Sequence, residues 1–160
     1  MKHDRLQIIG LGSPAGDDRL GWEVIERLEA ILPETAECDL TAYDRPGAGL
    51  IKHLAEYKHC WLVDALWSAD DEPGVYTRPD LETLKHARTG VAGSHGFGVA
   101  DTLMLASRLG ALPDSLELHC LTINSADRLG EHLSPAIDAG VDGLVKRLYQ
   151  RLIQSVDHSV

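Results

Sequence analysis

The stretch IIGLGSPAGDDRLG, residues 8–21, decides the fold. An apolar run ends in Gly10 and Gly12, a short loop follows, and two adjacent carboxylates, Asp17 and Asp18, precede the next apolar pattern. This order is typical of a buried strand that turns into a helix, and α/β proteins place their chemistry just past the carboxyl end of such a strand. An acid at a helix start can also cap the helix, so one of the two carboxylates has a purely structural interpretation.

Apolar runs and helical patterns alternate along the rest of the chain. They predict strands at 6–11, 37–43, 59–65, 74–77 and 115–124, and helices from Asp17 or Asp18 to Ile31, at 50–57, from an N-cap at Ser94 to 109, and at 135–153. We therefore expect an α/β three-layer sandwich, with a mostly parallel twisted sheet of about five strands and helices on both faces. Residues 1–160 are expected to form a single domain with a frayed tail at 154–160.

The composition narrows the class of protein and of partner. The chain has a net charge of −10, and its pI is about 5.1, which argues against binding to nucleic acid or to an anionic membrane. No apolar run is long enough for a signal peptide or a membrane span, so we expect a cytoplasmic protein. Cys38, Cys60 and Cys120 lie in or beside apolar runs without metal-binding spacing, which predicts reduced, mostly buried thiols.

Three further polar positions are expected to meet at one edge of the sheet. Asp18 follows the first strand, Asp64 ends the third, and His95 opens the helix after the edge strand. Loops at the carboxyl ends of parallel strands share one crevice, and two carboxylates with an imidazole suit a divalent ion such as Zn²⁺, Ni²⁺ or Cd²⁺. Structural interpretations remain open, because Asp64 can cap the next loop and His95 can be a surface histidine.

The ordered set of motifs resembles the hydrogenase maturation protease family. The resemblance rests on Gly10-Leu11-Gly12-Ser13, on Asp17-Asp18-Arg19-Leu20-Gly21, on Asp64 after a buried strand, on His95 before a helix with Gly98, Asp101 and Leu103, and on the segment from Gly130 to Pro135. It spans residues 6–150. Ser13 stands where the family usually has asparagine, and Arg19 stands where glycine is common, which places a cation next to Asp18.

The resemblance implies an endopeptidase that removes a C-terminal peptide from the precursor of a nickel–iron hydrogenase large subunit. By position, the family's metal-contacting residues fall on Asp18, Asp64 and His95, and the turn Asp44–Gly49 matches a segment beside the cleft. The nickel ion is carried by the substrate, with Cd or Zn as substitutes in isolation, and no organic cofactor is implied. The expected partner is the precursor of the hydrogenase large subunit, bound by a monomer.

The same residues also suggest other functions. The spacing of Gly10, Gly12 and Ala15 formally fits a dinucleotide-binding loop, but Asp17 and Asp18 place negative charge where a pyrophosphate would dock. The opening Gly10–Pro14 is also similar to that of peptidyl-tRNA hydrolases, whose following histidine is replaced here by acids. A non-catalytic metal-binding or scaffold role is a further alternative. Ser94 beside His95 is disfavoured as a nucleophile and base, because adjacent side chains rarely aim at each other.

Overall fold

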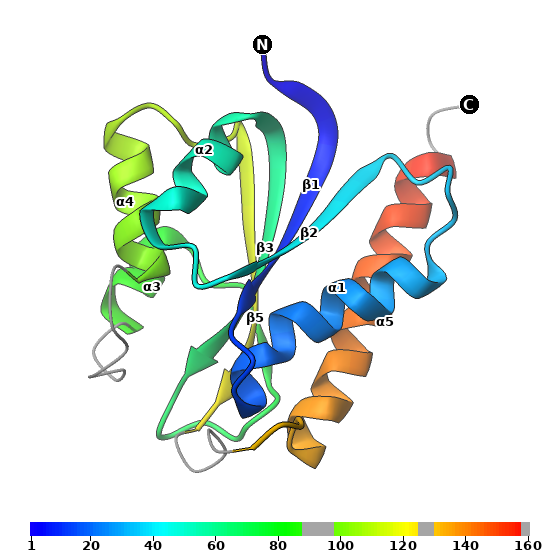
Figure 1. Ribbon diagram of the computed structural model, residues 1–160, viewed down its shortest axis with the longest axis vertical. Helices are drawn as coiled ribbons and strands as arrows, with labels where there is room; N and C mark the ends of the chain where they lie inside the picture. The colour runs from blue at the N-terminus through cyan, green and yellow to red at the C-terminus, as the bar shows by residue number, and fades with distance from the viewer. Residues whose placement is uncertain (88–97, 125–129, 158–160) are drawn as a thin grey trace.

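The computed structural model describes residues 1–87, 98–124 and 130–157. Its sheet has the strand order β2-β1-β3-β5-β4 (Figure 1). The strands are β1 (His3–Gly12), β2 (Cys38–Asp44), β3 (Tyr57–Trp67), β4 (Tyr76–Thr77) and β5 (Ser115–Ile123). Neighbouring strands run parallel except β4, which pairs antiparallel to β5 at the edge. The predicted mostly parallel sheet is confirmed.

Helices cover both faces of the sheet, as Figure 1 shows. On one face, α1 (Leu20–Ile31) and α5 (Pro135–Asp157) pack on Ile8, Val63 and Leu121. On the other, α2 (Leu50–Ala55) and α4 (Val99–Arg108) pack on Ile9, Leu62 and Leu118, next to α3 (Leu81–Ala87). The central strands β1, β3 and β5 are buried on both sides, because their side chains alternate between these two cores, whereas the edge strands β2 and β4 are only partly buried. The predicted three-layer α/β sandwich is therefore confirmed.

Element boundaries differ from the sequence pattern at places that matter for the site. A 3₁₀ turn, η1 (Gly16–Arg19), holds the two acids, so α1 begins only at Leu20. The prediction that Ser94 caps the next long helix is wrong, since α4 begins at Val99 with Gly98 as its N-cap. Strand β3 continues to Trp67, because its last residues pair with β5 up to Ile123. Helix α5 continues to Asp157, past the predicted end at residue 153.

A buried polar network fixes the short edge strand. The His119 side chain is fully buried on β5, where Nδ1 lies 2.8 Å from the Tyr76 hydroxyl and Nε2 lies 2.9 Å from Glu117 Oε2. Arg151 of α5 donates to both oxygens of Glu117, and Arg78 lies 3.2 Å from one of them. Both ring nitrogens of a neutral His119 are thus satisfied, and β4 is held to the sheet through Tyr76.

The order of the strands creates a crevice beside β1. The chain leaves β1 toward β2 on one side and reaches β3 on the other, so the strand order reverses at β1. In open α/β sheets ligands bind at the carboxyl ends of the strands at such a point. Asp18 lies in η1, which follows β1, and Asp64 lies in the C-terminal half of β3, which continues to Trp67, so the prediction that Asp64 ends this strand is wrong. None of the helices in the described ranges is long and apolar enough to cross a membrane.

Candidate active site

Close backbone packing explains the glycines of the loop after β1. A Cβ on Gly12 would lie 2.3 Å from the backbone oxygen of Asp18, and a Cβ on Gly21 would lie 2.2 Å from that of Leu11. The N–H of Ser13 also donates to the Asp18 oxygen at 3.2 Å. Any side chain at these glycines would push η1 off the strand. The glycines therefore set where the Asp18 backbone lies relative to the sheet.

The two adjacent carboxylates have different roles. Asp17 is buried, and its carboxylate accepts hydrogen bonds from the backbone N–H of Ser134 at 2.7 Å and from the Ser134 hydroxyl at 2.9 Å. It thus ties the start of α5 to the first loop, and the expectation that it caps its own helix is wrong. Asp17 is thus bound to Ser134, and of the two adjacent acids it is Asp18 whose charge acts on Asp64.

Asp18 and Asp64 form a carboxylate pair at the carboxyl edge of β1 and β3. Burial, with a further contribution from the negative charge of Asp18, raises the pKa of Asp64 to about 8. The Ala65 N–H donates to Asp64 Oδ1 at 2.8 Å and opposes the rise only in part. Because Ala65 belongs to β3, this bond is local to the strand and does not cap the loop that follows it. Near neutral pH the pair therefore holds a proton that a bound cation would displace.

The turn after β2 brings a cation to the same edge. Arg45 has a φ of 42°, and its backbone N–H donates to the Gly12 oxygen at 3.0 Å. Its pKa is raised by hydrogen bonding to Asp44, with a smaller contribution from the charge of Asp18. The start of this turn therefore lies against the end of β1, while the place of Asp44–Gly49 beside a cleft stays a prediction, and Arg45 is a cation near Asp18 that the sequence pattern did not indicate. Its position directly after the strand next to β1 is the signal that could have found it.

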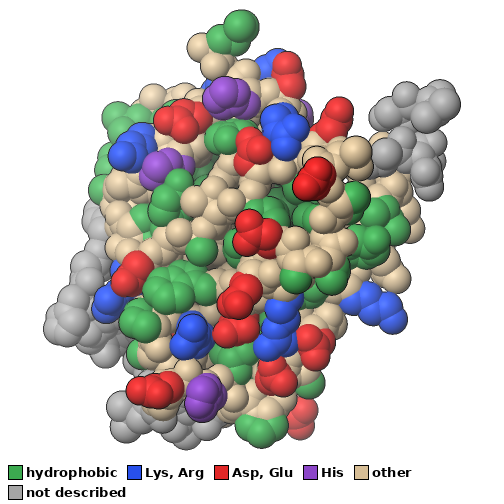
Figure 2. Space-filling model, turned by 45° about the vertical axis from the view of Figure 1, so that its right-hand side comes forward, with side chains coloured by type: hydrophobic (Ala, Val, Ile, Leu, Met, Phe, Trp, Pro, Cys, Tyr) green, Lys and Arg blue, Asp and Glu red, His purple; other side chains and the backbone are tan. Residues whose placement is uncertain are grey.

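The guanidinium of Arg19, the residue after Asp18, contacts Glu131 and Glu23. Nη1 donates to the Glu131 oxygen at 3.1 Å, and Nε lies 3.7 Å from Glu23 Oε1. These groups line a cleft of about 730 Å³ beside α1 and the start of α5, where Arg27 binds Asp138 at 2.6 Å. Figure 2 shows acidic and basic side chains interspersed on the surface. The cleft is thus lined by side chains of both signs that already pair with each other.

The third expected ligand, His95, lies outside the described residues. Within the described ranges, no three histidine, cysteine, aspartate or glutamate side chains form a metal-binding group. The three cysteines are free, as predicted, and Cys60 and Cys120 are buried. Burial, with a smaller contribution from the charge of Asp64, raises the pKa of Cys120 far above its usual range, so its thiol is not a nucleophile at neutral pH.

Comparisons with known proteins identify the family of this chain. The family model described as hydrogenase maturation protease matches residues 23–151. The hydrogenase 2 maturation protease of Escherichia coli is 25% identical over 155 residues, which cover 94% of this chain and 92% of that protein.

Solved structures show the same fold. A hydrogenase maturating endopeptidase from Escherichia coli superposes with a TM-score of 0.73 at 24% identity, covering 94% of this chain and 93% of that one. A [NiFe] hydrogenase maturation protease from Thermococcus kodakarensis superposes with a TM-score of 0.71 at 22% identity, covering 92% of each chain.

Fold and site together define an α/β domain with an acidic site at the point where its strand order reverses. The chain belongs to the hydrogenase maturation protease family, and it is a peptidase. This membership decides against the dinucleotide-binding and peptidyl-tRNA hydrolase alternatives. The family model covers Asp64 and the position of His95, whereas the loop with Asp18 precedes the matched range.

Proposed function

We propose that this peptidase removes a C-terminal peptide from the nickel-loaded precursor of a nickel–iron hydrogenase large subunit. Membership of the family and the names of the relatives, which refer to hydrogenase maturation, support this substrate class. In the proposal the nickel ion belongs to the substrate. Asp18, Asp64 and His95 contact that ion, and the precursor is the macromolecular partner.

The observation that carries the proposal is the electrostatic coupling of Asp18 and Asp64. Two ionised carboxylates at one crevice repel each other, and the repulsion adds to the cost of burying Asp64. A divalent cation removes both penalties, and it displaces the proton that Asp64 holds near neutral pH. Oxygen ligands together with an imidazole nitrogen match the ligand preference of Ni²⁺. The pair is therefore suited to recognise a metal ion.

A site of this kind distinguishes loaded from empty precursor. A precursor without nickel brings no cation to relieve the repulsion between Asp18 and Asp64, so its complex with the protease is weaker. A precursor with nickel offers open coordination positions to Asp18, Asp64 and His95. Selectivity for the loaded precursor then follows from the electrostatics of the protease site.

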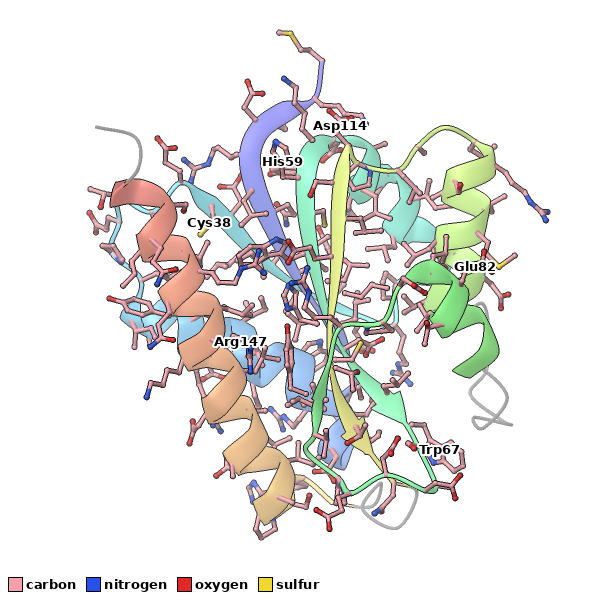
Figure 3. The ribbon with its side chains drawn as sticks, turned by 180° about the vertical axis from the view of Figure 1, so that it is seen from behind. Cys38, His59, Trp67, Glu82, Asp114 and Arg147 are labelled. Carbon is pink, nitrogen blue, oxygen red and sulfur yellow. The ribbon has the colours of Figure 1, made fainter. Side chains whose placement is uncertain are left out.

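Metal titration of the isolated protease tests the ligand set. We expect Cd²⁺ or Ni²⁺ to bind at one weak site by calorimetry, with proton release near neutral pH, and we expect Asp18→Asn and Asp64→Asn to abolish it. Asp114→Asn is the charge-matched control, because Asp114 lies at the opposite end of the molecule from the carboxyl end of β3 (Figure 3). Unchanged metal affinity in Asp64→Asn would refute the ligand assignment.

Cleavage of the precursor tests the same residues in the reaction. We expect His95→Gln and Asp64→Asn to lose cleavage of nickel-loaded precursor while keeping the circular dichroism spectrum of the wild-type fold. The control Asp114→Asn should cleave at the wild-type rate. An Asp64→Asn and His95→Gln double variant with full activity would contradict the proposal.

A further inference from the structure

Three arginines gather around Tyr76 on the face of the sheet that α5 covers. Arg147 and Arg151 belong to α5, and Arg78 directly follows β4. The guanidinium of Arg147 lies 4.3 Å from the centre of the Tyr76 ring, and that of Arg151 lies 4.3 Å from the centre of the Trp61 ring. Figure 3 shows Arg147 near the middle of α5. We call these three arginines the arginine patch.

The arginine patch carries more positive charge than its neighbours neutralise. Among the described residues, Glu117 is the carboxylate that it contacts, through both nitrogens of the Arg151 fork and, at 3.2 Å, through Arg78. His119 contacts the same carboxylate but is neutral at pH 7, because burial lowers its pKa to about 4. Arg147 and Arg151 are four residues apart on α5, a spacing at which like charges repel. Three positive charges therefore face one negative charge.

Arg147 has the donors that a partner could use. Its guanidinium lies over the face of Tyr76 and binds no acceptor among the described residues. Stacking on a ring occupies the face of a guanidinium and leaves the N–H groups at its edge for hydrogen bonds. The Arg147 side chain is exposed, and those of Arg78 and Arg151 are 50% and 36% exposed. The arginine patch thus presents N–H donors at the surface.

The ligand chemistry that fits the arginine patch is a peptide segment rich in carboxylates. The edge of a guanidinium matches a carboxylate in bidentate geometry. The chain as a whole has 25 acidic against 15 basic residues, so most of its surface repels an acidic partner. A local excess of positive charge on such a protein fixes the orientation in which the partner arrives. The overall net charge of −10 opposes a nucleic acid as the ligand.

We propose that the arginine patch is a docking surface for an acidic segment of the hydrogenase large-subunit precursor. The identity of the partner rests on the proposed function. Arg151 covers Trp61, which precedes Asp64 by three residues on β3, about 10 Å along the strand. The two side chains point to opposite faces of the sheet, so the acidic segment reaches the arginine patch past the short edge strand β4. Stable interfaces cover about 800 Å² of each partner, about 30 Å across, so a precursor seated at Asp64 extends that far.

Nuclear magnetic resonance tests the ligand chemistry without any cleavage. The wild-type protein is titrated at low salt with two blocked pentapeptides, one with glutamate at alternate positions and one with glutamine there. The Nε–H signal of Arg147, assigned by its loss in Arg147→Gln, should shift with the glutamate peptide and not with the glutamine peptide. The signal of Arg108, an exposed arginine of α4 on the other face of the sheet, should stay in place. Equal responses to both peptides, or none, would overturn the proposal.

Cleavage kinetics test the same surface with the precursor. Arg78→Gln and Arg147→Gln each remove one charge, whereas Arg151 is left in place because Glu117 depends on it. Each variant should raise the KM for nickel-loaded precursor about threefold, and the double variant should raise it about tenfold, as expected for surface ion pairs. The kcat should stay within twofold, since the docking contacts are made equally in ground and transition states. The control Arg108→Gln should keep the wild-type KM.

The two tests distinguish failure of the docking surface from failure of the proposed function. If the wild type cleaves precursor but both variants keep its KM, the docking surface is wrong and the function stands. If the wild type does not cleave, the function and the named partner are wrong, and the peptide titration still decides whether the arginine patch binds acidic segments. A dimer in sedimentation that Arg147→Gln dissociates, with KM unchanged, would assign the arginine patch to a second copy of this acidic chain and contradict the proposal.

Discussion

His119 makes a sharp prediction about pH, because its side chain is fully buried and neutral. Burial lowers the pKa of His119 to about 4, against about 6.5 in an unfolded chain. Between these values the unfolded state binds more protons than the native state, so stability falls as the pH falls. We expect His119 to lower the free energy of unfolding by between about 1 and 2 kcal/mol when the pH falls from 7.5 to 5.5.

Urea unfolding followed by circular dichroism measures this contribution. The wild type is compared at pH 7.5 and 5.5, above the pI of about 5.1, with His119→Gln, whose amide keeps one donor and one acceptor. Other titrating groups, including Asp64 with its opposite sign, are present in both proteins and cancel in the difference. The wild type should lose between about 1 and 2 kcal/mol more than the variant on acidification. Equal losses would refute the assignment of a buried neutral histidine.

Three further predictions concern the packing and the charges of the site. Asp17→Ala should lower the free energy of unfolding by about 3 kcal/mol, because it removes two bonds to Ser134; a double-mutant cycle with Ser134→Ala that shows no coupling would contradict this. Gly12→Ala should lower the free energy of unfolding in urea by at least about 2 kcal/mol. The control Gly143→Ala, whose Cβ meets nothing within 4 Å, should raise it by up to about 1 kcal/mol. Equal effects of the two substitutions would refute the packing argument. Asp64→Asn should have a higher free energy of unfolding than the wild type, and the difference should grow as the pH rises toward 8. The reason is that the raised pKa of Asp64 makes its ionised form, which gains population over this range, costly in the folded protein. A difference that shrinks as the pH rises would refute the charge argument.

The fold and the first half of the site could be predicted because their causes are local. The glycines of residues 8–21, the buried run that ends at Asp64 and the helical apolar spacing each act over a few residues. They predicted the strand–helix alternation, and parallel pairing then placed Asp18 and Asp64 at one edge. His95 stays a prediction, since it lies outside the described residues.

Other features depend on contacts between distant segments, which no local pattern reveals. The partner of Asp17 is Ser134, 117 residues away, so a cap of its own helix was the simpler interpretation. Glu117 and His119 alternate with apolar neighbours like an exposed strand face, but Tyr76 and Arg151 cover them. Trp67 belongs to β3 only because β5 continues beside it.

The most direct test of the central claim is mass spectrometry of a hydrogenase large-subunit precursor incubated with this protein. We expect the nickel-loaded precursor to lose a C-terminal peptide, and the same precursor without nickel to stay intact. Loading the empty precursor with nickel in the same tube should start the cleavage. Equal cleavage with and without nickel, or no cleavage of the loaded precursor, would contradict the account of a peptidase that recognises its substrate through a carboxylate pair and a substrate-borne metal ion.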